Sequence, residues 1–75
     1  MEQYKNLGGN SGVAAYEISD DSIKVEFKDG SIYLYSYTRA GIQNIEEMKK
    51  LAINGRGLNS FINRRVRKLY DAKLR

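Results

Sequence analysis

An α+β fold is predicted for this chain: a three-stranded antiparallel sheet followed by two helices packed on one of its faces, in the order β-β-β-α-α. The prediction rests on the hydrophobic pattern, whose period changes midway along the sequence. Up to residue 37, apolar and polar residues alternate as on half-buried strands. Beyond residue 39, apolar residues recur every three or four positions, as on amphipathic helices. With 75 residues, the chain has the length of one small domain.

The expected strands share this alternation and are bounded by turn residues and glycines. They are Val13–Ser19, Ile23–Phe27 and Ile32–Tyr37, with Asp20-Asp21 as the first turn. The preceding stretch ends in a run of glycine, asparagine and serine that is typical of loops. We therefore expect a flexible N-terminal lead-in at residues 1–12 and a single domain at residues 13–75.

The second turn, Asp29-Gly30, is a hairpin signal that permits two registers. A two-residue turn starts from Lys28 and places Tyr33 and Tyr35 on the outer face of the sheet, as a platform for stacking. A three-residue turn with a glycine bulge starts from Phe27 and directs both tyrosines toward the core. The local sequence permits both registers, so the two tyrosines are candidates either for stacking or for the core.

Two helices are expected in the second half of the chain. The first extends over about Arg39–Ile53, and Gly55 supplies the left-handed conformation that ends it. The second begins after Gly57, with Asn59 or Ser60 as its N-cap. At 100° per residue, the second helix has an apolar face of Phe61, Ile62, Val66, Leu69 and Tyr70 and a polar face of Arg64, Arg67, Lys68, Asp71 and Arg75.

Charge is distributed unevenly along the chain. Residues 1–38 contain three lysines against six acidic residues, whereas residues 39–75 contain ten Lys or Arg against three acidic residues. The net charge therefore changes from −3 in the first half to +7 in the second, and the whole chain carries +4. Such asymmetry is typical of proteins with an anionic partner, and a nucleic acid is expected before a membrane surface.

Basic residues in and just before the second helix are the candidate nucleic-acid-binding residues; they are Arg56, Arg64, Arg67 and Lys68. Arginine suits this role because its planar guanidinium group binds phosphate through two hydrogen bonds. The alternative interpretation is a solvent-facing helix surface. Some of its positive charges would then be favoured near the helix C-terminus by the helix dipole. RNA is the expected partner, and Tyr33 and Tyr35 add base stacking only if they are exposed.

Several kinds of site are excluded by what the sequence lacks. It has no cysteine and no histidine, which removes disulfides, thiolate metal sites and the commonest general base. Glu46 and Glu47 are adjacent and point to different faces of a helix, and Asp20-Asp21 provide too few oxygens for calcium. We therefore expect no enzyme activity, no cofactor and no metal.

No stretch approaches the ~18 apolar residues of a membrane span, and a cytoplasmic bacterial protein is expected.

Two motifs match a known family. A central Tyr-x-Tyr follows an apolar strand and a glycine turn, and an aromatic-x-Asn-x-x-Val-Arg-x-x-Tyr signature ends the helical half. Over about residues 11–70 the chain resembles the KTSC domain, a small family named for its occurrence at the C-terminus of some lysyl-tRNA synthetases and found also as stand-alone bacterial proteins. The resemblance rests on Phe27, Asp29-Gly30, Tyr33, Tyr35, Ala52, Phe61, Asn63, Val66, Arg67 and Tyr70.

The resemblance supports the α+β fold and implies an RNA-binding role, which the synthetase context suggests. In the family the residue between the two tyrosines varies. This variation implies that Tyr33 and Tyr35 face the core, and it favours the bulged register of the hairpin.

A second hypothesis is a protein-binding or self-associating module. A sheet of only three strands has open edges, and either Val13–Ser19 or Tyr33–Tyr37 could pair with a second copy of the chain. The basic face could equally meet an acidic protein surface. A homodimer or a heterologous protein partner is therefore the alternative to RNA.

Overall fold

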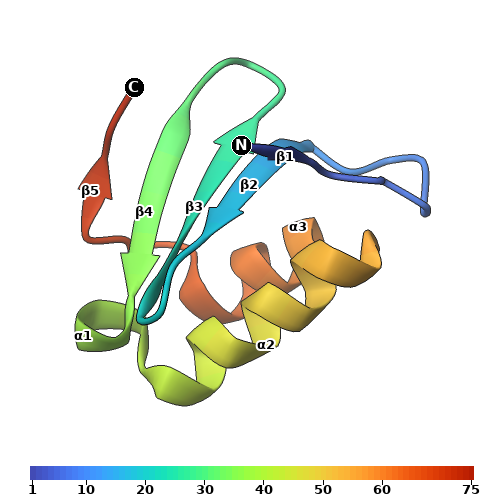
Figure 1. Ribbon diagram of the computed structural model, residues 1–75. Coiled ribbons are helices and arrows are strands. Elements are labelled where there is room, and N and C mark those ends of the chain that lie inside the picture. The colour runs from blue at the N-terminus through green and yellow to red at the C-terminus, as the bar shows by residue number, and fades with distance from the viewer.

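Five antiparallel strands form a meander in which the order in the sheet follows the order along the chain (Figure 1). The computed structural model describes all residues, 1–75. The strands are β1 (Glu2–Gln3), β2 (Val13–Ile18), β3 (Ser22–Phe27), β4 (Ile32–Ser36) and β5 (Ala72–Lys73). The α+β class is confirmed and the three predicted strands form the centre of the sheet, but the prediction of only three strands missed both outer ones.

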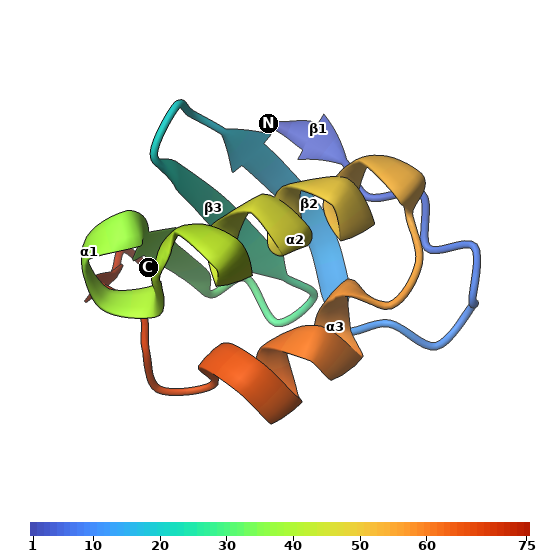
Figure 2. The same cartoon turned by 90° about the horizontal axis from the view of Figure 1, so that it is seen from below.

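The helices lie together on one face of this sheet. They are α1 (Tyr37–Ala40), α2 (Ile42–Asn54) and α3 (Leu58–Phe61), and α3 continues directly into the π-helical turn η1 (Ile62–Val66). Figure 2 shows α2 and α3 side by side across the sheet. None of the helices has the length and apolar run required to cross a membrane.

The first predicted helix is divided in two by Gly41. Ser36 caps α1 by accepting a hydrogen bond from the Thr38 backbone N–H at 3.2 Å. Gly41 then adopts φ 90° and ψ 150°, which no helix accommodates, and its N–H donates to the carbonyl of Tyr37. A single helix over Arg39–Ile53 was therefore wrong, because glycine reaches this backbone conformation without the steric cost of a Cβ.

The last helix is much shorter than predicted. It starts at Leu58, with Gly57 rather than Asn59 or Ser60 at the N-cap, and it ends at Val66. The chain then returns to the sheet, where the Asp71 N–H donates to the carbonyl of Leu34 and β5 pairs with β4. Arg75 is therefore not part of a basic helix face, and Leu69 and Tyr70 lie beyond the helix. Backbone groups at the edge of β4 need partners, and β5 supplies them.

The β3–β4 hairpin adopts the bulged register. The Phe27 N–H donates to the carbonyl of Ser31 at 2.8 Å, and Gly30 has φ 92°. Beyond this turn, Val25 pairs with Tyr33 and Ile23 pairs with Tyr35, so both tyrosines face the helices. Of the two registers that the sequence permitted, the structure has the one with a three-residue turn and a left-handed glycine.

The N-terminal segment is part of the domain rather than a lead-in to it. Strand β1 pairs with β2, and Tyr4 is 3% exposed within the core. The Tyr4 hydroxyl accepts a hydrogen bond from the Leu58 N–H at 3.3 Å, and the Leu7 N–H donates to the carbonyl of Gly55 at 2.7 Å. The expected boundary at residue 13 is corrected, because residues 2–7 contact both the sheet and the end of α2.

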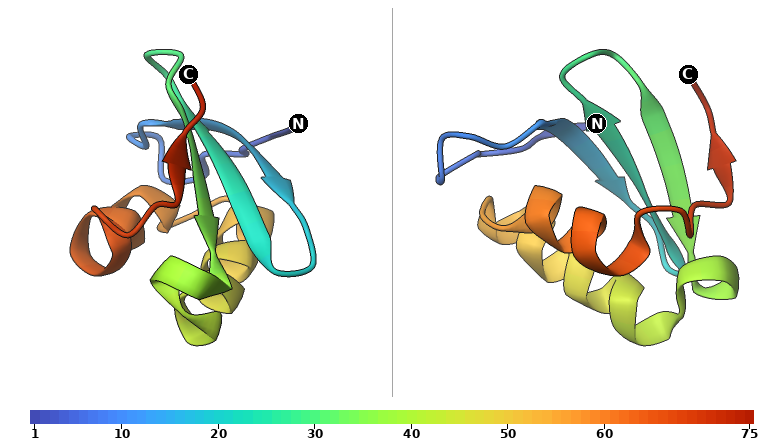
Figure 3. Two further views of the ribbon diagram at one scale, coloured as in Figure 1. Left: turned by 90° about the vertical axis from the view of Figure 1, so that its left-hand side faces the viewer. Right: turned by 180° about the vertical axis from the view of Figure 1, so that it is seen from behind.

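Both strand edges that the sequence left open are partly covered. Strand β1 lies along Ala15 and Tyr16 of β2, and β5 lies along Tyr33 and Leu34 of β4. Figure 3 shows β1 and β5 at opposite edges of the sheet. Pairing of Val13–Ser19 or Tyr33–Tyr37 with a second copy would have to displace these strands, since paired backbone groups are no longer available.

The core lies between the sheet on one side and α2 and the α3–η1 helix on the other. Three residues predicted on the apolar face of the first helix, Ile45, Met48 and Ala52, are buried, whereas Ile42 is 61% exposed. Leu58, Ile62 and Val66 bury the inner face of the last helix. From the strands, the core takes Val13, Tyr16, Ile23, Val25 and Tyr35. Burial of these apolar groups is the main source of stability in a domain of this size.

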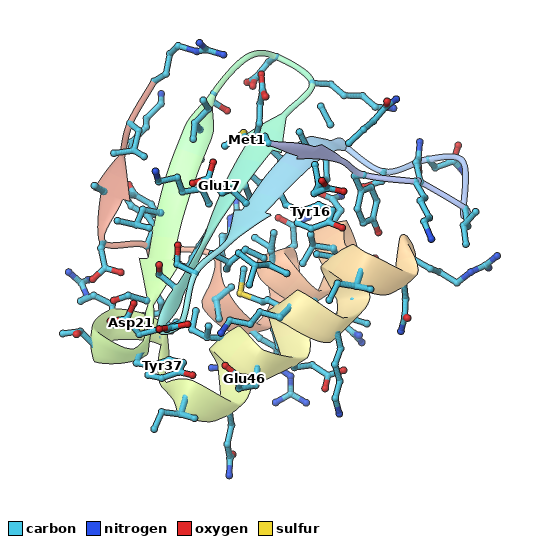
Figure 4. All side chains as sticks on the ribbon, in the orientation of Figure 1. Met1, Tyr16, Glu17, Asp21, Tyr37 and Glu46 are labelled. Atoms are coloured by element: carbon cyan, nitrogen blue, oxygen red, sulfur yellow. The ribbon has the colours of Figure 1, made fainter.

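The β2–β3 turn is tied to α2 by a small polar network. The Tyr37 hydroxyl donates to the Glu46 carboxylate at 2.6 Å, and the Lys49 ammonium lies 2.8 Å from the same carboxylate and donates to the carbonyl of Asp20. Figure 4 shows Tyr37 and Glu46 close together below Asp21. Hydrogen bonds from Lys49 and then Tyr37 lower the pKa of Glu46. The network therefore favours the charged form of Glu46 at neutral pH.

Replacing Gly55 with alanine tests the contact between the N-terminal segment and α2. Gly55 has φ 77°, and a Cβ there would lie 2.5 Å from the Cβ of Lys5. We expect Gly55→Ala to lower the free energy of unfolding by about 2 kcal/mol, since the left-handed conformation alone costs roughly 1–2 kcal/mol for other residues. Gly8→Ala, where nothing lies within 4 Å, serves as the control and should stay within about 0.5 kcal/mol. Urea denaturation measures both, and equal effects would contradict the packing described.

Candidate nucleic-acid interface

An aromatic cleft of about 460 Å³ lies between β4, the β3–β4 turn and the end of the last helix. Four aromatic side chains line it: Phe27, Tyr33, Tyr35 and Tyr70. The rings of Tyr33 and Tyr70 meet edge to face with centroids 4.9 Å apart, and those of Phe27 and Tyr33 meet in the same way at 5.7 Å. Such pairs hold one another in place. A cleft of this size and lining is typical of ligand sites.

Tyr35 lies at the floor of the cleft. Its side chain belongs to the core and is 2% exposed, yet its hydroxyl makes no hydrogen bond with the protein. Every fully buried polar side-chain atom of the protein has a hydrogen-bond partner. Because the Tyr35 hydroxyl has none, it belongs to the small part of Tyr35 that is exposed, and it opens into the cleft that Tyr35 lines. Burial, with smaller contributions from Tyr33 and Tyr70, raises the pKa of Tyr35 to about 12.

Polar and charged groups form the rim. Lys28, Asp29 and Ser31 come from the β3–β4 turn, and Asn63 and Arg67 come from η1 and the turn after it. Asp29 is already engaged, because its carboxylate accepts hydrogen bonds from the Ser31 N–H at 2.9 Å and the Ser31 hydroxyl at 2.7 Å, which lowers the pKa of Asp29. The rim therefore presents two cations, Lys28 and Arg67, and one charged carboxylate, Asp29, above an aromatic interior.

The ion pairs of the molecule lie elsewhere; they are Lys24–Glu17, Lys49–Glu46 and Arg75–Glu26. The basic residues predicted to bind nucleic acid are all exposed and take part in none of these pairs. Arg64, Arg67 and Lys68 fall within five consecutive residues at the end of the last helix. Their charges are therefore available to an anionic ligand.

Arg56 is separate from this group. It lines a small polar hollow of about 160 Å³ with asparagines and serines of the N-terminal loop and of α3. The nine residues of α3 and η1 lie between Arg56 and Arg67, which corresponds to roughly 14 Å at the helical rise. Of the four predicted residues, only Arg67 lines the cleft; Arg64 and Lys68 are its neighbours in sequence, and Arg56 lies at the other end of the helix.

The sequence did not predict the cleft itself. Lys28, Ser31 and Gly12 line it, and none of them was a candidate residue. A signal for the cleft was present, however, in the residues on which the family resemblance rests. Seven of these share the cleft although they are distant in sequence: Phe27, Asp29, Tyr33, Tyr35, Asn63, Arg67 and Tyr70.

In comparisons with known proteins, no protein-family model, curated protein or solved structure matches this chain.

The pKa of Tyr35 predicts a titration at unusually high pH. A raised pKa in the folded state means that the neutral phenol is favoured. The stability that the neutral Tyr35 phenol contributes is therefore fully present below the unfolded pKa of about 10. It is lost as the pH rises through the folded pKa of about 12. Absorbance of phenolate at 295 nm should show one tyrosine of the folded protein titrating near this upper value. Tyr35→Phe should remove that step, and its persistence in the variant would assign it to another tyrosine.

Tyr70 and Arg67 are expected to differ in what they contribute. Tyr70 packs edge to face against both Tyr33 and Tyr35, so Tyr70→Ala should lower the free energy of unfolding by about 2–3 kcal/mol. Arg67 is exposed and unpaired, so Arg67→Ala should change the free energy of unfolding by less than about 0.5 kcal/mol. Thermal or urea unfolding compares the two. A comparable loss in both variants would mean that Arg67 is needed for folding.

Proposed function

We propose that this chain is a KTSC-like domain that binds single-stranded RNA without catalysing a reaction on it. One observation carries the proposal: unpaired cations lie at the rim of a cleft whose interior is lined by three tyrosines and a phenylalanine. A single strand exposes phosphates and bases along its ribose backbone, and this site offers a matching group to each of these two.

The cations provide the contacts to phosphate. Arg67 lines the rim of the cleft, and Arg64 and Lys68 are exposed neighbours in sequence of the lining residues Asn63 and Arg67. Because none of them is held by a carboxylate, a phosphate has no internal partner to displace. Contacts of this kind supply most of the affinity of nucleic-acid binding that is independent of sequence.

The aromatic interior favours a single strand over a duplex. Bases in a duplex are stacked on one another and reachable only along their edges, whereas unpaired bases can turn outward onto aromatic side chains. Stacking of this kind is tolerant of sequence. An acidic protein surface could also meet the cations, but it would leave the aromatic cleft without a role.

A binding role without catalysis is supported by the chemistry of the cleft. The hydroxyl groups that line it belong to Ser31 and to three tyrosines, and the one carboxylate among the lining residues, Asp29, accepts its hydrogen bonds from Ser31. An activated nucleophile requires a free general base within hydrogen-bond reach. We therefore assign the cleft to recognition.

Salt dependence tests the proposal. Binding of a short unstructured RNA, followed by fluorescence anisotropy, should weaken as salt rises, with log K falling by roughly 0.7 per phosphate contact against log salt. Arg64→Ala and Arg67→Ala should each reduce this slope by about one contact. Lys50→Ala removes the same charge from the exposed surface of α2 and should leave the slope unchanged. Absence of binding at low salt, or a slope of zero, would rule the proposal out.

A further inference from the structure

We infer that the aromatic cleft is a pocket for one unpaired nucleobase, with Tyr35 at its floor contacting the polar edge of that base. This inference deepens the proposed function and rests on it for the source of the base. It assigns a different task to each part of the site, since the exposed cations hold phosphates while the cleft recognises the base between them.

The interior of the cleft suits a flat aromatic ligand. Phe27, Tyr33 and Tyr70 are only partly buried, and the surface that they leave exposed includes their part of the cleft. Their edge-to-face contacts with one another fix the ring orientations before any ligand arrives. Affinity then requires little ordering of side chains on binding. Ile62 adds an apolar wall from the last helix.

The Tyr35 hydroxyl indicates that the ligand has a polar edge. Tyr35 is only 2% exposed, and its hydroxyl makes no hydrogen bond within the protein. A purely hydrocarbon ligand would cover this hydroxyl without satisfying it, which is unfavourable. The ring nitrogens, carbonyl oxygens and amino groups of a nucleobase can accept from it or donate to it. Asn63 at the rim offers an amide with the same versatility.

Charge around the cleft decides against a cationic ligand. An ammonium ligand is attracted to aromatic faces, but cations already beside those faces repel it. Here the Lys73 ammonium already lies 5.8 Å from the centroid of the Tyr33 ring, and Lys28 and Arg67 stand at the rim. Lys28 belongs to the β3–β4 turn and Arg67 to the end of the last helix, so the cations flank the cleft from two elements. This arrangement suits a base that carries a phosphate on either side.

An oligonucleotide with a single base separates recognition of the base from contact with phosphate. The probe is a short RNA whose central 2-aminopurine is its one base, every other position being abasic, compared with the same strand abasic throughout. We expect the base-carrying RNA to bind roughly tenfold more tightly, as for one stacked base, with a change in 2-aminopurine fluorescence. Tyr35→Phe should weaken binding of the base-carrying RNA severalfold and leave the abasic RNA unaffected.

Lys68→Ala is the matched control, because it removes a cation that does not line the cleft. It should weaken both RNAs equally through the salt slope. Equal binding of base-carrying and abasic RNA, together with a normal salt slope, would overturn the pocket and leave the proposed function standing.

If neither RNA binds, the proposed function fails, and titration with free adenosine and uridine monophosphates tests the pocket directly. Shifts in the ring resonances of Tyr33 and Tyr70 that Tyr35→Phe reduces would then support a mononucleotide site. Unchanged resonances would overturn the inference.

Discussion

The hydrogen bond from the Phe27 N–H to the carbonyl of Ser31 closes the β3–β4 turn, and the position of every side chain on β4 follows from it. Neighbouring residues of a strand point to opposite faces, so a turn shorter by one residue would move Tyr33 and Tyr35 to the face without helices. The core would then lose its largest buried side chain, Tyr35, and the cleft would have no floor. Gly30 makes this turn accessible because its φ of 92° is free of strain only for glycine.

The return of the chain to the sheet after Val66 completes the cleft from the other side. Backbone hydrogen bonds from Asp71 to Leu34 and from Leu74 to Ile32 bring the segment after the last helix against β4. Tyr70 thereby meets the rings of Tyr33 and Tyr35. The wider π-helical turn at residues 62–66 precedes this return, and such turns recur at functional sites. The same pairing that protects the edge of the sheet therefore also assembles the candidate site.

In the proposed site, stability and recognition fall to different atoms of Tyr33, Tyr35 and Tyr70. Their rings pack against each other and against the core, whereas their hydroxyls remain without protein partners. The cations at the rim, by contrast, form no ion pair with a carboxylate of the protein. They therefore stay available to a ligand. A small domain has little core to spare for a deep pocket. In the proposed function, the exposed side of these core aromatics serves as the binding surface, at little cost in packing.

The sequence alone determined the features that depend on local periodicity and on single glycines: the central strands, the buried face of α2, and the helix end at Gly55, whose φ is 77°. It also located the basic residues and the spacing of Arg56 from Arg67 along the chain. Only the tertiary structure decided which cations stay outside ion pairs, the hairpin register and the outer strands β1 and β5. The register and the outer strands depend on which backbone groups find partners across long stretches of chain. Residues 2–3 and 72–73 are too few to show a periodic pattern that would predict their pairing. The cleft belongs to this second group, since its aromatic residues come from segments that meet only when the last of the chain closes against β4.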